Sequence, residues 1–178
     1  GVDTFDRGLT ANVVSALDSS CKINCSWQAL AGNGATINQA LSFNQPVVKP
    51  DILLLTFGVN DTTQFTSARQ WQENIVHCVE KFTDKKTQVF FTAVPNMAQF
   101  PLLPAPLSWV LGIKAASLHR SLAAVCRQNN WQLIDSDITI KEDWMATDGY
   151  HPNADGYAIW GAAIADAIAS QIQRLDQG

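Results

Sequence analysis

The stretch Asp51-Ile52-Leu53-Leu54-Leu55-Thr56-Phe57-Gly58-Val59-Asn60-Asp61 is the most informative part of this chain of 178 residues. Its apolar half, residues 52–55, is typical of a strand that is buried on both faces of a parallel sheet. Its polar half places Asn60 just beyond the strand, where a side-chain amide can donate a hydrogen bond to a developing oxyanion. The alternative is that Asn60 and Asp61 only cap the helix that follows.

Strands and helices alternate on both sides of this stretch. Alternating or continuous apolar residues predict further strands at 23–29, 89–94 and 131–135. Apolar residues at helical spacing predict helices over 7–18, 37–41, 71–82, 111–125 and 157–172, with Asn153 as the N-cap of the last helix. This alternation predicts an α/β fold, a three-layer flavodoxin-like parallel sheet with helices on both faces.

Length and composition predict a single domain over residues 1–178. Hydrophobic residues make up 47% of the chain and charged residues 16%, as in an ordinary globular protein. The formal net charge of -4 gives no electrostatic reason to expect nucleic acid or an anionic membrane surface as a partner. No apolar run approaches the roughly 20 residues of a membrane span, so no integral membrane segment is expected.

Four cysteines are too few for a disulfide scaffold in a chain of this length. Cys21 and Cys25 have a spacing that suits a metal, but no second Cys/His pair accompanies them, so no metal is expected. Cys25 is expected to face the core, and Cys78 and Cys126 are expected on helix faces.

The motif Asp148-Gly149-Tyr150-His151-Pro152-Asn153 opens the last predicted helix. A turn of this length can bring the Asp148 carboxylate to one ring nitrogen of His151 and leave the other nitrogen facing a cleft. The carboxylate would then fix the tautomer of a general base and stabilise the imidazolium. The same residues also suit an Asx-turn at a helix start, with His151 merely solvated.

A glycine loop at 31–35 precedes the stretch quoted first. Gly34 lets the backbone approach a ligand closely, and its N–H is a candidate second oxyanion donor, although an ordinary turn glycine has the same signature. Ligands of parallel sheets bind beyond the carboxyl ends of the strands. We therefore expect Gly34, Asn60, the proline-rich loop 95–106 and the Asp148 motif to converge on one edge of the sheet.

The loop 95–106 contains four prolines and several apolar residues. Exposed apolar residues in a long loop favour a lip over a site rather than a linker. Phe100 and the nearby Trp109 are therefore assigned to an apolar wall that faces the substrate. His77 and His119 lie within helical patterns and have no acidic partner at a useful spacing, so both are interpreted as structural.

In this order the motifs resemble the SGNH (GDSL-type) hydrolase family, whose sequence blocks one, two, three and five carry serine, glycine, asparagine and histidine. Gly34 is similar to the block-two glycine and Asn60 to the block-three asparagine. Asp148 and His151 are similar to the Asp-x-x-His of block five. The resemblance covers nearly the whole chain, and residues 100–112 are similar to a bacterial subgroup of these enzymes. It implies no cofactor.

The serine of block one has no counterpart in this sequence. Gly1-Val2-Asp3 resembles the loop that follows the family's Gly-Asp-Ser, and the early serines do not lie at a strand-to-helix elbow (Ser15, Ser19, Ser20 and Ser26). The resemblance therefore implies that the nucleophile and the family's first strand lie upstream of Gly1. Since that strand lies inside the sheet, two strands would have unpaired edges without it.

The resemblance implies a hydrolase that acts on small-molecule esters, of the esterase or lipase type. His151 would be the base, oriented by Asp148, and Gly34 and Asn60 would form the oxyanion hole. A catalytically inactive SGNH-like binding module is the main alternative, and a flavodoxin-like binder of phosphate or nucleotide is a third. Acyl chain length, cellular compartment and oligomeric state cannot be read from the sequence.

Overall fold

A parallel three-stranded sheet is formed by the apolar runs in the computed structural model, which describes residues 8–135 and 142–176. The strands are β1 (Ile52–Leu55), β2 (Gln88–Thr92) and β3 (Gln132–Ile134), in the order β1-β2-β3. Leu53 lies opposite Val89, and Phe91 lies opposite Leu133. The predicted α/β class with a parallel sheet is therefore confirmed.

The chain divides into two compact units. The sheet unit comprises residues 30–99 and 104–135 and contains all three strands. The helical unit comprises the described parts of the remaining chain, residues 8–29, 100–103 and 142–176.

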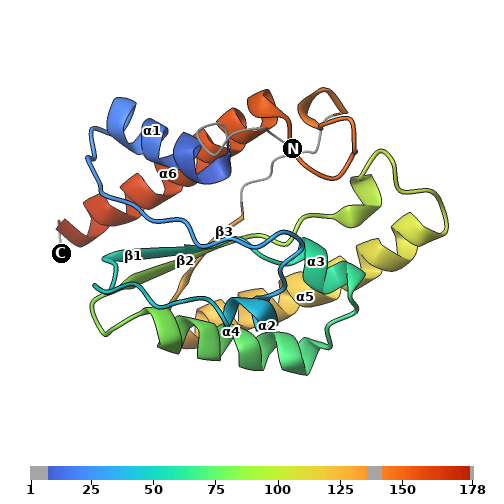
Figure 1. Cartoon of the computed structure of the whole chain (residues 1–178), viewed down its shortest axis with the longest axis horizontal. Helices are drawn as coiled ribbons and strands as arrows, with labels where there is room; N and C mark the ends of the chain where they lie inside the picture. The colour runs from blue at the N-terminus through green and yellow to red at the C-terminus, as the bar shows by residue number, and fades with distance from the viewer. Residues whose placement is uncertain (1–7, 136–141, 177–178) are drawn as a thin grey trace. The chain divides into compact units, whose positions relative to one another are not determined.

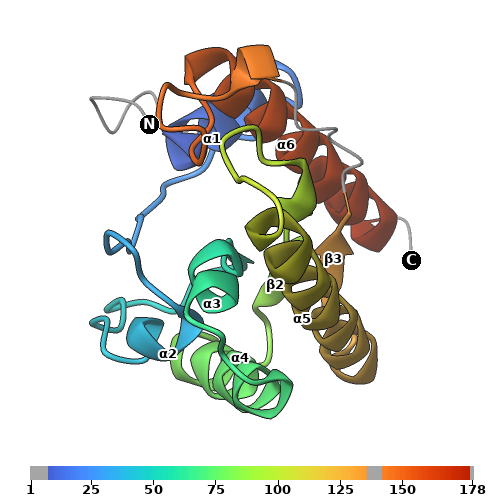
Figure 2. The same ribbon diagram turned by 90° about the vertical axis from the view of Figure 1, so that its right-hand side faces the viewer.

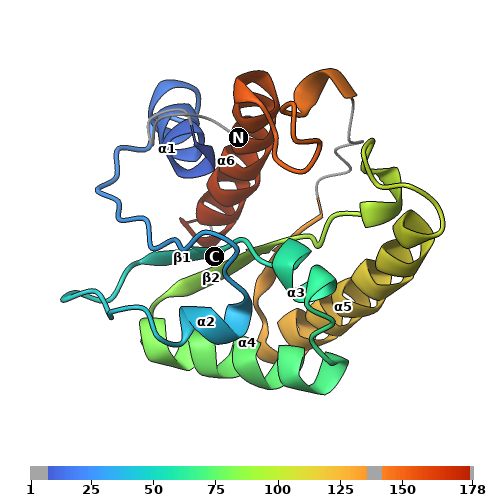
Figure 3. The same cartoon turned by 45° about the vertical axis from the view of Figure 1, so that its right-hand side comes forward.

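Five helical segments belong to the sheet unit: α2 (Ile37–Ala40), α3 (Val59–Thr63), α4 (Ala68–Phe82), the 3-10 turn η2 (Met97–Gln99) and α5 (Leu107–Asn129). Figures 1 and 3 show α4 and α5 on the same face of the sheet. The two helices pack against each other, and the buried Trp71 indole N–H donates to the carbonyl of Leu118 at 3.1 Å. Their buried stripes follow the predicted helical spacing.

The helical unit consists of α1 (Leu9–Ser19), the 3-10 turn η3 (Glu142–Trp144) and α6 (Ala154–Asp176). The helices α1 and α6 pack side by side (Figure 2). Gly161 makes this close approach feasible, because a Cβ atom there would lie 2.7 Å from the Cβ atom of Asn12. Asn153 caps α6 as predicted, since its Oδ1 accepts from Gly156 N at 3.0 Å.

The predicted strand at 23–29 is not formed. This segment has no regular structure, and Cys25, expected to face the core, is exposed, as is Trp27. An isolated extended segment has no ladder to stabilise it, and among the described residues no strand pairs with this one. The cysteines Cys78 and Cys126 are buried on α4 and α5, as expected.

Strand β1 is less buried than its sequence predicts. Only Leu55 is fully buried, and residues 52–54 remain partly accessible. The reason is that β1 pairs with β2 alone, so its outer edge is not covered by another strand of the described residues. The sequence positions 1–3, interpreted as a loop, lie outside the described part of the chain.

The apolar side chains of the proline-rich loop are less exposed than its composition predicted. Met97, Phe100 and Leu103 are buried, whereas Leu102 is 57% exposed. The turn η2 packs closely on α5, where a Cβ atom at Gly112 would lie 2.7 Å from the Cβ atom of Ala98. This contact holds the first part of the loop, residues 97–99, on α5.

Candidate active site

The Asp148–His151 pair forms a closed turn in the helical unit. One carboxylate oxygen of Asp148 accepts from the backbone N–H groups of Tyr150 and His151, at 2.9 and 3.0 Å. The other oxygen lies 2.8 Å from His151 Nδ1. Both sequence interpretations are therefore partly right, because an Asx-turn is present and it also holds the carboxylate against the imidazole.

These contacts stabilise the charged form of the Asp148 carboxylate. The backbone N–H groups of His151 and Tyr150 and then the His151 side chain hold the pKa of Asp148 well below its usual range. An ionised carboxylate at Nδ1 favours the tautomer in which Nδ1 carries the proton and Nε2 has a free lone pair. The His151 side chain is 58% exposed, so the pair has the chemistry of an oriented, accessible general base.

The loop segment 100–103 supports this turn from within the same unit. Gly149 has φ = 64°, and a Cβ atom there would overlap the side chain of Leu102. The ring of Phe100 contacts that of Tyr150, with centroids 6.2 Å apart. The apolar part of the loop therefore packs on the backbone that carries His151, a role that its sequence did not reveal.

Asn60 follows β1 in the sheet unit, as predicted, and it lies on α3. The N-cap of α3 is Gly58, which makes no side-chain capping bond, so Asn60 does not cap this helix. Instead, Asn60 Nδ2 donates to the carbonyl of Ala35 at 3.1 Å. A carboxamide has two N–H donors, and the described residues accept only one of them, so the other can donate to a ligand.

Gly34 lies beside Asn60, because the Asn60 amide bonds the residue that follows Gly34 in the chain. Gly34 has φ = 68°, a conformation that favours glycine, and a Cβ atom there would meet nothing within 4 Å. The backbone is therefore open to a ligand on this side. The structure brings Gly34 and Asn60 together within the sheet unit, and Asp148 and His151 together within the helical unit.

Asp61 is a residue of this region whose importance sequence analysis missed. Its side chain is fully buried, and both carboxylate oxygens accept from Ile37 N, at 3.2 and 3.3 Å. Burial raises the pKa of Asp61 to about 6, against the opposing effect of hydrogen bonds from Ile37 and Thr66. The only sequence signal was its place in the Gly-Val-Asn-Asp motif, which we interpreted as a possible cap.

The remaining predicted residues divide between the two units. Trp109 lies near the start of α5 and is 65% exposed, whereas Phe100 is buried against Tyr150. His119 does have an acidic neighbour, since its Nε2 lies 3.9 Å from Asp135 Oδ2. His77 is exposed on α4.

The four early serines do not lie at a strand-to-helix elbow in the structure either. Ser15 and Ser19 lie in α1, Ser20 is its C-cap and Ser26 is on the irregular segment that follows. None of these four starts a helix after a strand, which is the position that an activated serine occupies in a strand-to-helix elbow. They are therefore not assigned to the site.

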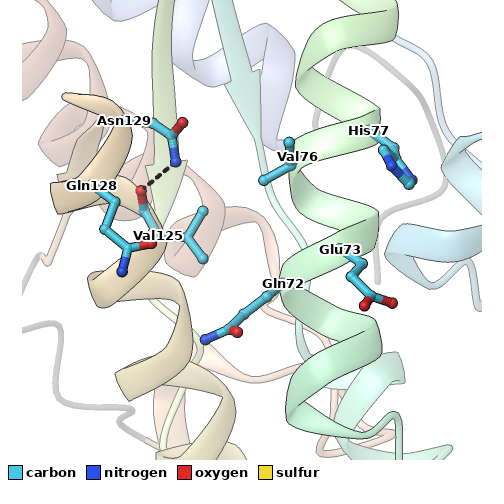
Figure 4. A pocket seen from close by; sticks show the side chains of 7 residues that line it. All are labelled: Gln72, Glu73, Val76, His77, Val125, Gln128 and Asn129. Atoms are coloured by element: carbon cyan, nitrogen blue, oxygen red, sulfur yellow. Dashed lines mark hydrogen bonds between the residues drawn. The ribbon is translucent and has the colours of Figure 1, made fainter.

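A groove lies between α4 and α5 within the sheet unit (Figure 4). It is lined by Gln72, Glu73, Val76, His77, Val125, Gln128 and Asn129. The Asn129 amide donates within its own helix, to the Val125 carbonyl at 2.9 Å, and Glu73 pairs with Arg69. None of the predicted site residues lines this groove, and its only histidine is His77, which the sequence analysis interpreted as structural.

The described residues were expected to hold neither a metal site nor a membrane span. Within residues 8–135 and 142–176, no cluster of three or more His, Cys, Asp or Glu side chains has an arrangement that could hold a metal ion. Over the same residues, every helix is too short or too polar to cross a membrane.

Comparison with known proteins gives a family match over most of the chain. The sequence model of the GDSL-like lipase/acylhydrolase family matches residues 2–159. A search of curated proteins finds no match.

Solved structures with a similar fold include three hydrolases. The psychrotrophic esterase EstA from Pseudoalteromonas sp. shares 18% identity at a TM-score of 0.64, covering 94% of this chain and 89% of that chain. LAE5, an alpha/beta hydrolase from the metagenome of Lake Arreo, shares 15% identity at a TM-score of 0.64, covering 96% of this chain and 84% of that chain. Est24, a carbohydrate acetylesterase from Sinorhizobium meliloti, shares 18% identity at a TM-score of 0.57, covering 94% of this chain and 87% of that chain. At these identities the likeness shows the fold.

Proposed function

Since the chain belongs to the GDSL-like lipase/acylhydrolase family, we propose that it is the main part of a serine hydrolase that cleaves small-molecule esters. The observation that carries the proposal is the 2.8 Å contact between Asp148 Oδ2 and His151 Nδ1, which makes His151 an oriented base. The proposal treats residues 1–178 as one domain in which this pair and the Gly34–Asn60 pair face the same substrate.

The proposed roles follow from the chemistry of each group. His151 Nε2 takes the proton of a serine hydroxyl as that oxygen attacks the ester carbonyl, and then returns the proton to the leaving alcohol. Asp148 stabilises the imidazolium between these steps. The negative charge that develops on the carbonyl oxygen is held by the Gly34 N–H and by the Asn60 N–H that Ala35 does not occupy.

The serine itself is proposed to lie upstream of Gly1, on a strand that pairs with the outer edge of β1. Among the described residues no strand pairs with that edge, so its backbone N–H and C=O groups suit pairing with a further strand of the same sheet. A serine at the end of such a strand would follow the rule that parallel sheets build their sites beyond the carboxyl ends of the strands.

The substrate is proposed to contact an apolar wall that includes Trp109, which is exposed. Phe100 acts on this wall indirectly in the proposal, because its ring packs on Tyr150 in the turn that carries His151. An apolar wall favours an acyl or aryl group, and it needs no cofactor.

Hydrolysis of p-nitrophenyl esters by the full-length gene product tests the proposal. His151→Ala is expected to lower kcat by about a millionfold, since the base and nucleophile act as one unit. Asn60→Ala is expected to lower kcat about 10²- to 10³-fold with little change in KM. His77→Ala, which removes an exposed histidine of α4, is the matched control and should be as active as the wild type. Unchanged turnover in His151→Ala would exclude this mechanism.

The competing function is an SGNH-like binding module that does not hydrolyse its ligand. The sequence feature that favours it is the lack of a Gly-Asp-Ser block in residues 1–178. The gene sequence upstream of Gly1 distinguishes the two functions, because a serine elbow encoded there favours the enzyme. Ester binding without turnover by the full-length product would favour the binding module.

A further inference from the structure

A buried acidic side chain connects the two segments that carry the proposed oxyanion donors. Asp61 follows Asn60 on α3, and its carboxylate accepts from the N–H of Ile37, the first residue of α2. Asp61 and Ile37 are both 0% exposed. The contact spans 24 positions in the sequence, so it is a tertiary contact and not part of a local turn.

Three side chains from α3 and its C-cap contact the backbone of the Gly34 loop and of the first residue of α2. Gln64 Nε2 donates to the Gly34 carbonyl at 3.4 Å, and Asn60 Nδ2 donates to the Ala35 carbonyl at 3.1 Å. The Asp61 carboxylate then receives the N–H of Ile37. Among these contacts, the one made by Asp61 is the buried one, and it involves the only group of the three that can carry a charge. The other two contacts end on neutral backbone carbonyls.

The conformation of Gly34 depends on such contacts because side-chain packing does not hold it. A Cβ atom at Gly34 would meet nothing within 4 Å, and its φ of 68° is accessible to glycine without being imposed on it. The direction of the Gly34 N–H is therefore set by the hydrogen bonds on either side of it. On one side, Ala35 N donates to the Gly32 carbonyl at 3.1 Å. On the other side, the nearest buried anchor is the Ile37–Asp61 bond.

We propose that Asp61 is a positioning residue, which sets the distance and direction between the Gly34 N–H and the Asn60 amide. This inference rests on the proposed function, in which those two groups are the oxyanion donors. Asp61 does not touch the substrate. Asn60 supplies one donor. Its neighbour Asp61 holds Ile37, and through it the loop whose Gly34 N–H is the second donor.

Among the described residues, no cation lies beside the Asp61 carboxyl to offset its burial. Burial is the largest influence on its pKa, and no lysine, arginine or histidine of the described residues shifts that pKa. The helix α2 has no titratable side chain, and α4 sends Lys81 to the carbonyls of Leu41 and Phe43. The helix α5 carries Lys114, His119, Arg120 and Arg127, none of which contributes to the pKa shift of Asp61. The hydroxyl of Thr66, 3.3 Å from Asp61 Oδ1, is the one side-chain donor that the described residues give it.

Kinetics with the full-length gene product and p-nitrophenyl acetate form the first arm of the test. Asp61→Asn keeps the shape of the side chain and removes its charge. It is expected to lower kcat about tenfold, a part of the 10²- to 10³-fold that loss of a whole donor costs, with KM within twofold. Thr66→Val, which removes only the hydroxyl donor, is the matched variant and should lower kcat less than threefold. A wild-type kcat in folded Asp61→Asn would overturn the proposal.

An NMR titration of the same protein decides the question without activity. It uses the His151→Ala background, so that the imidazole does not titrate. The amides of Gly34 and Ile37 are expected to shift together with a single midpoint near pH 6, and both shifts are expected to vanish in the Asp61→Asn, His151→Ala variant. If the Gly34 amide does not titrate, or still titrates in that variant, Asp61 does not hold the loop.

The two arms separate this inference from the proposed function. If the unmodified protein hydrolyses no ester, the proposed function fails, and the titration alone confirms or overturns the connection between Asp61 and Gly34. If the Asp61→Asn variant does not fold, the titration of Ile37 and Gly34 with Asp61 in place still gives a result. If the Ile37 and Gly34 amides titrate with different midpoints in that experiment, the inference is contradicted.

Discussion

At Gly58 the backbone adopts φ = 125°, and a Cβ atom there would lie 2.8 Å from a methyl group of Val94. Gly58→Ala is therefore expected to lower the free energy of unfolding by about 2 kcal/mol or more, because strain and a clash add together. Gly34→Ala is the matched control, since its φ is also positive but the space is open, and about 1 kcal/mol is expected. Urea unfolding measures both, and equal losses would mean that the Val94 contact is unimportant.

The buried Asp61 carboxyl makes stability depend on pH. Its folded-state pKa of about 6 lies above the ordinary value of 3.8, so between these values the folded state holds a proton that the unfolded state has released. Stability from this group is therefore greatest at pH values below about 4 and falls as pH rises to about 6, by up to about 3 kcal/mol. Urea unfolding at pH 4.5 and at pH 7 measures the change in the free energy of unfolding between these pH values. The decrease from pH 4.5 to pH 7 should be smaller for Asp61→Asn than for the wild type, and equal decreases would contradict this.

At the scale of elements, the start of α6 is held by one side chain with two functions. Asn153 Oδ1 accepts from Gly156 N, and its Nδ2 donates to the carbonyl of Asp143 at 2.7 Å. Asn153→Ala is expected to lower the free energy of unfolding by about 1 kcal/mol or somewhat more, because an N-cap bond is lost together with the link to η3. Asn153→Asp keeps the cap and loses only the link, so thermal unfolding should place it between the alanine variant and the wild type.

The elements also show where sequence patterns predict correctly and where they do not. The amphipathic helix α4 is formed as its spacing predicted, because its apolar stripe packs on a face that the spacing itself defines. The segment 23–29 alternates equally well but forms no strand, since a strand is stable only beside a partner. The loop residues Met97 and Phe100 are buried, although a proline-rich composition predicted exposure.

At the scale of the whole molecule, the outer edge of β1 has a testable consequence. Gln88 N donates to the Asp51 carbonyl, so the backbone groups of Asp51 point toward β2. Because backbone groups alternate in direction along a strand, the N–H groups of Leu53 and Leu55 also point toward β2, whereas those of Ile52 and Leu54 point outward. In the 178-residue chain, hydrogen exchange should therefore be slow at Leu53 and Leu55 and fast at Ile52 and Leu54. In the full-length product, Ile52 and Leu54 should become protected. Unchanged exchange there would contradict the proposed upstream strand.

The sequence by itself determined the features that are local in the chain. These are the helices, the apolar runs that form β1, β2 and β3, the cap at Asn153 and the contact between Asp148 and His151, because each depends on residues only a few positions apart. The tertiary structure alone decided what depends on distant partners. It placed Asp61 against Ile37, turned Phe100 onto Tyr150 and left the outer edge of β1 without a neighbour among the described residues. Burial and strand pairing are properties of surroundings that a linear pattern does not contain.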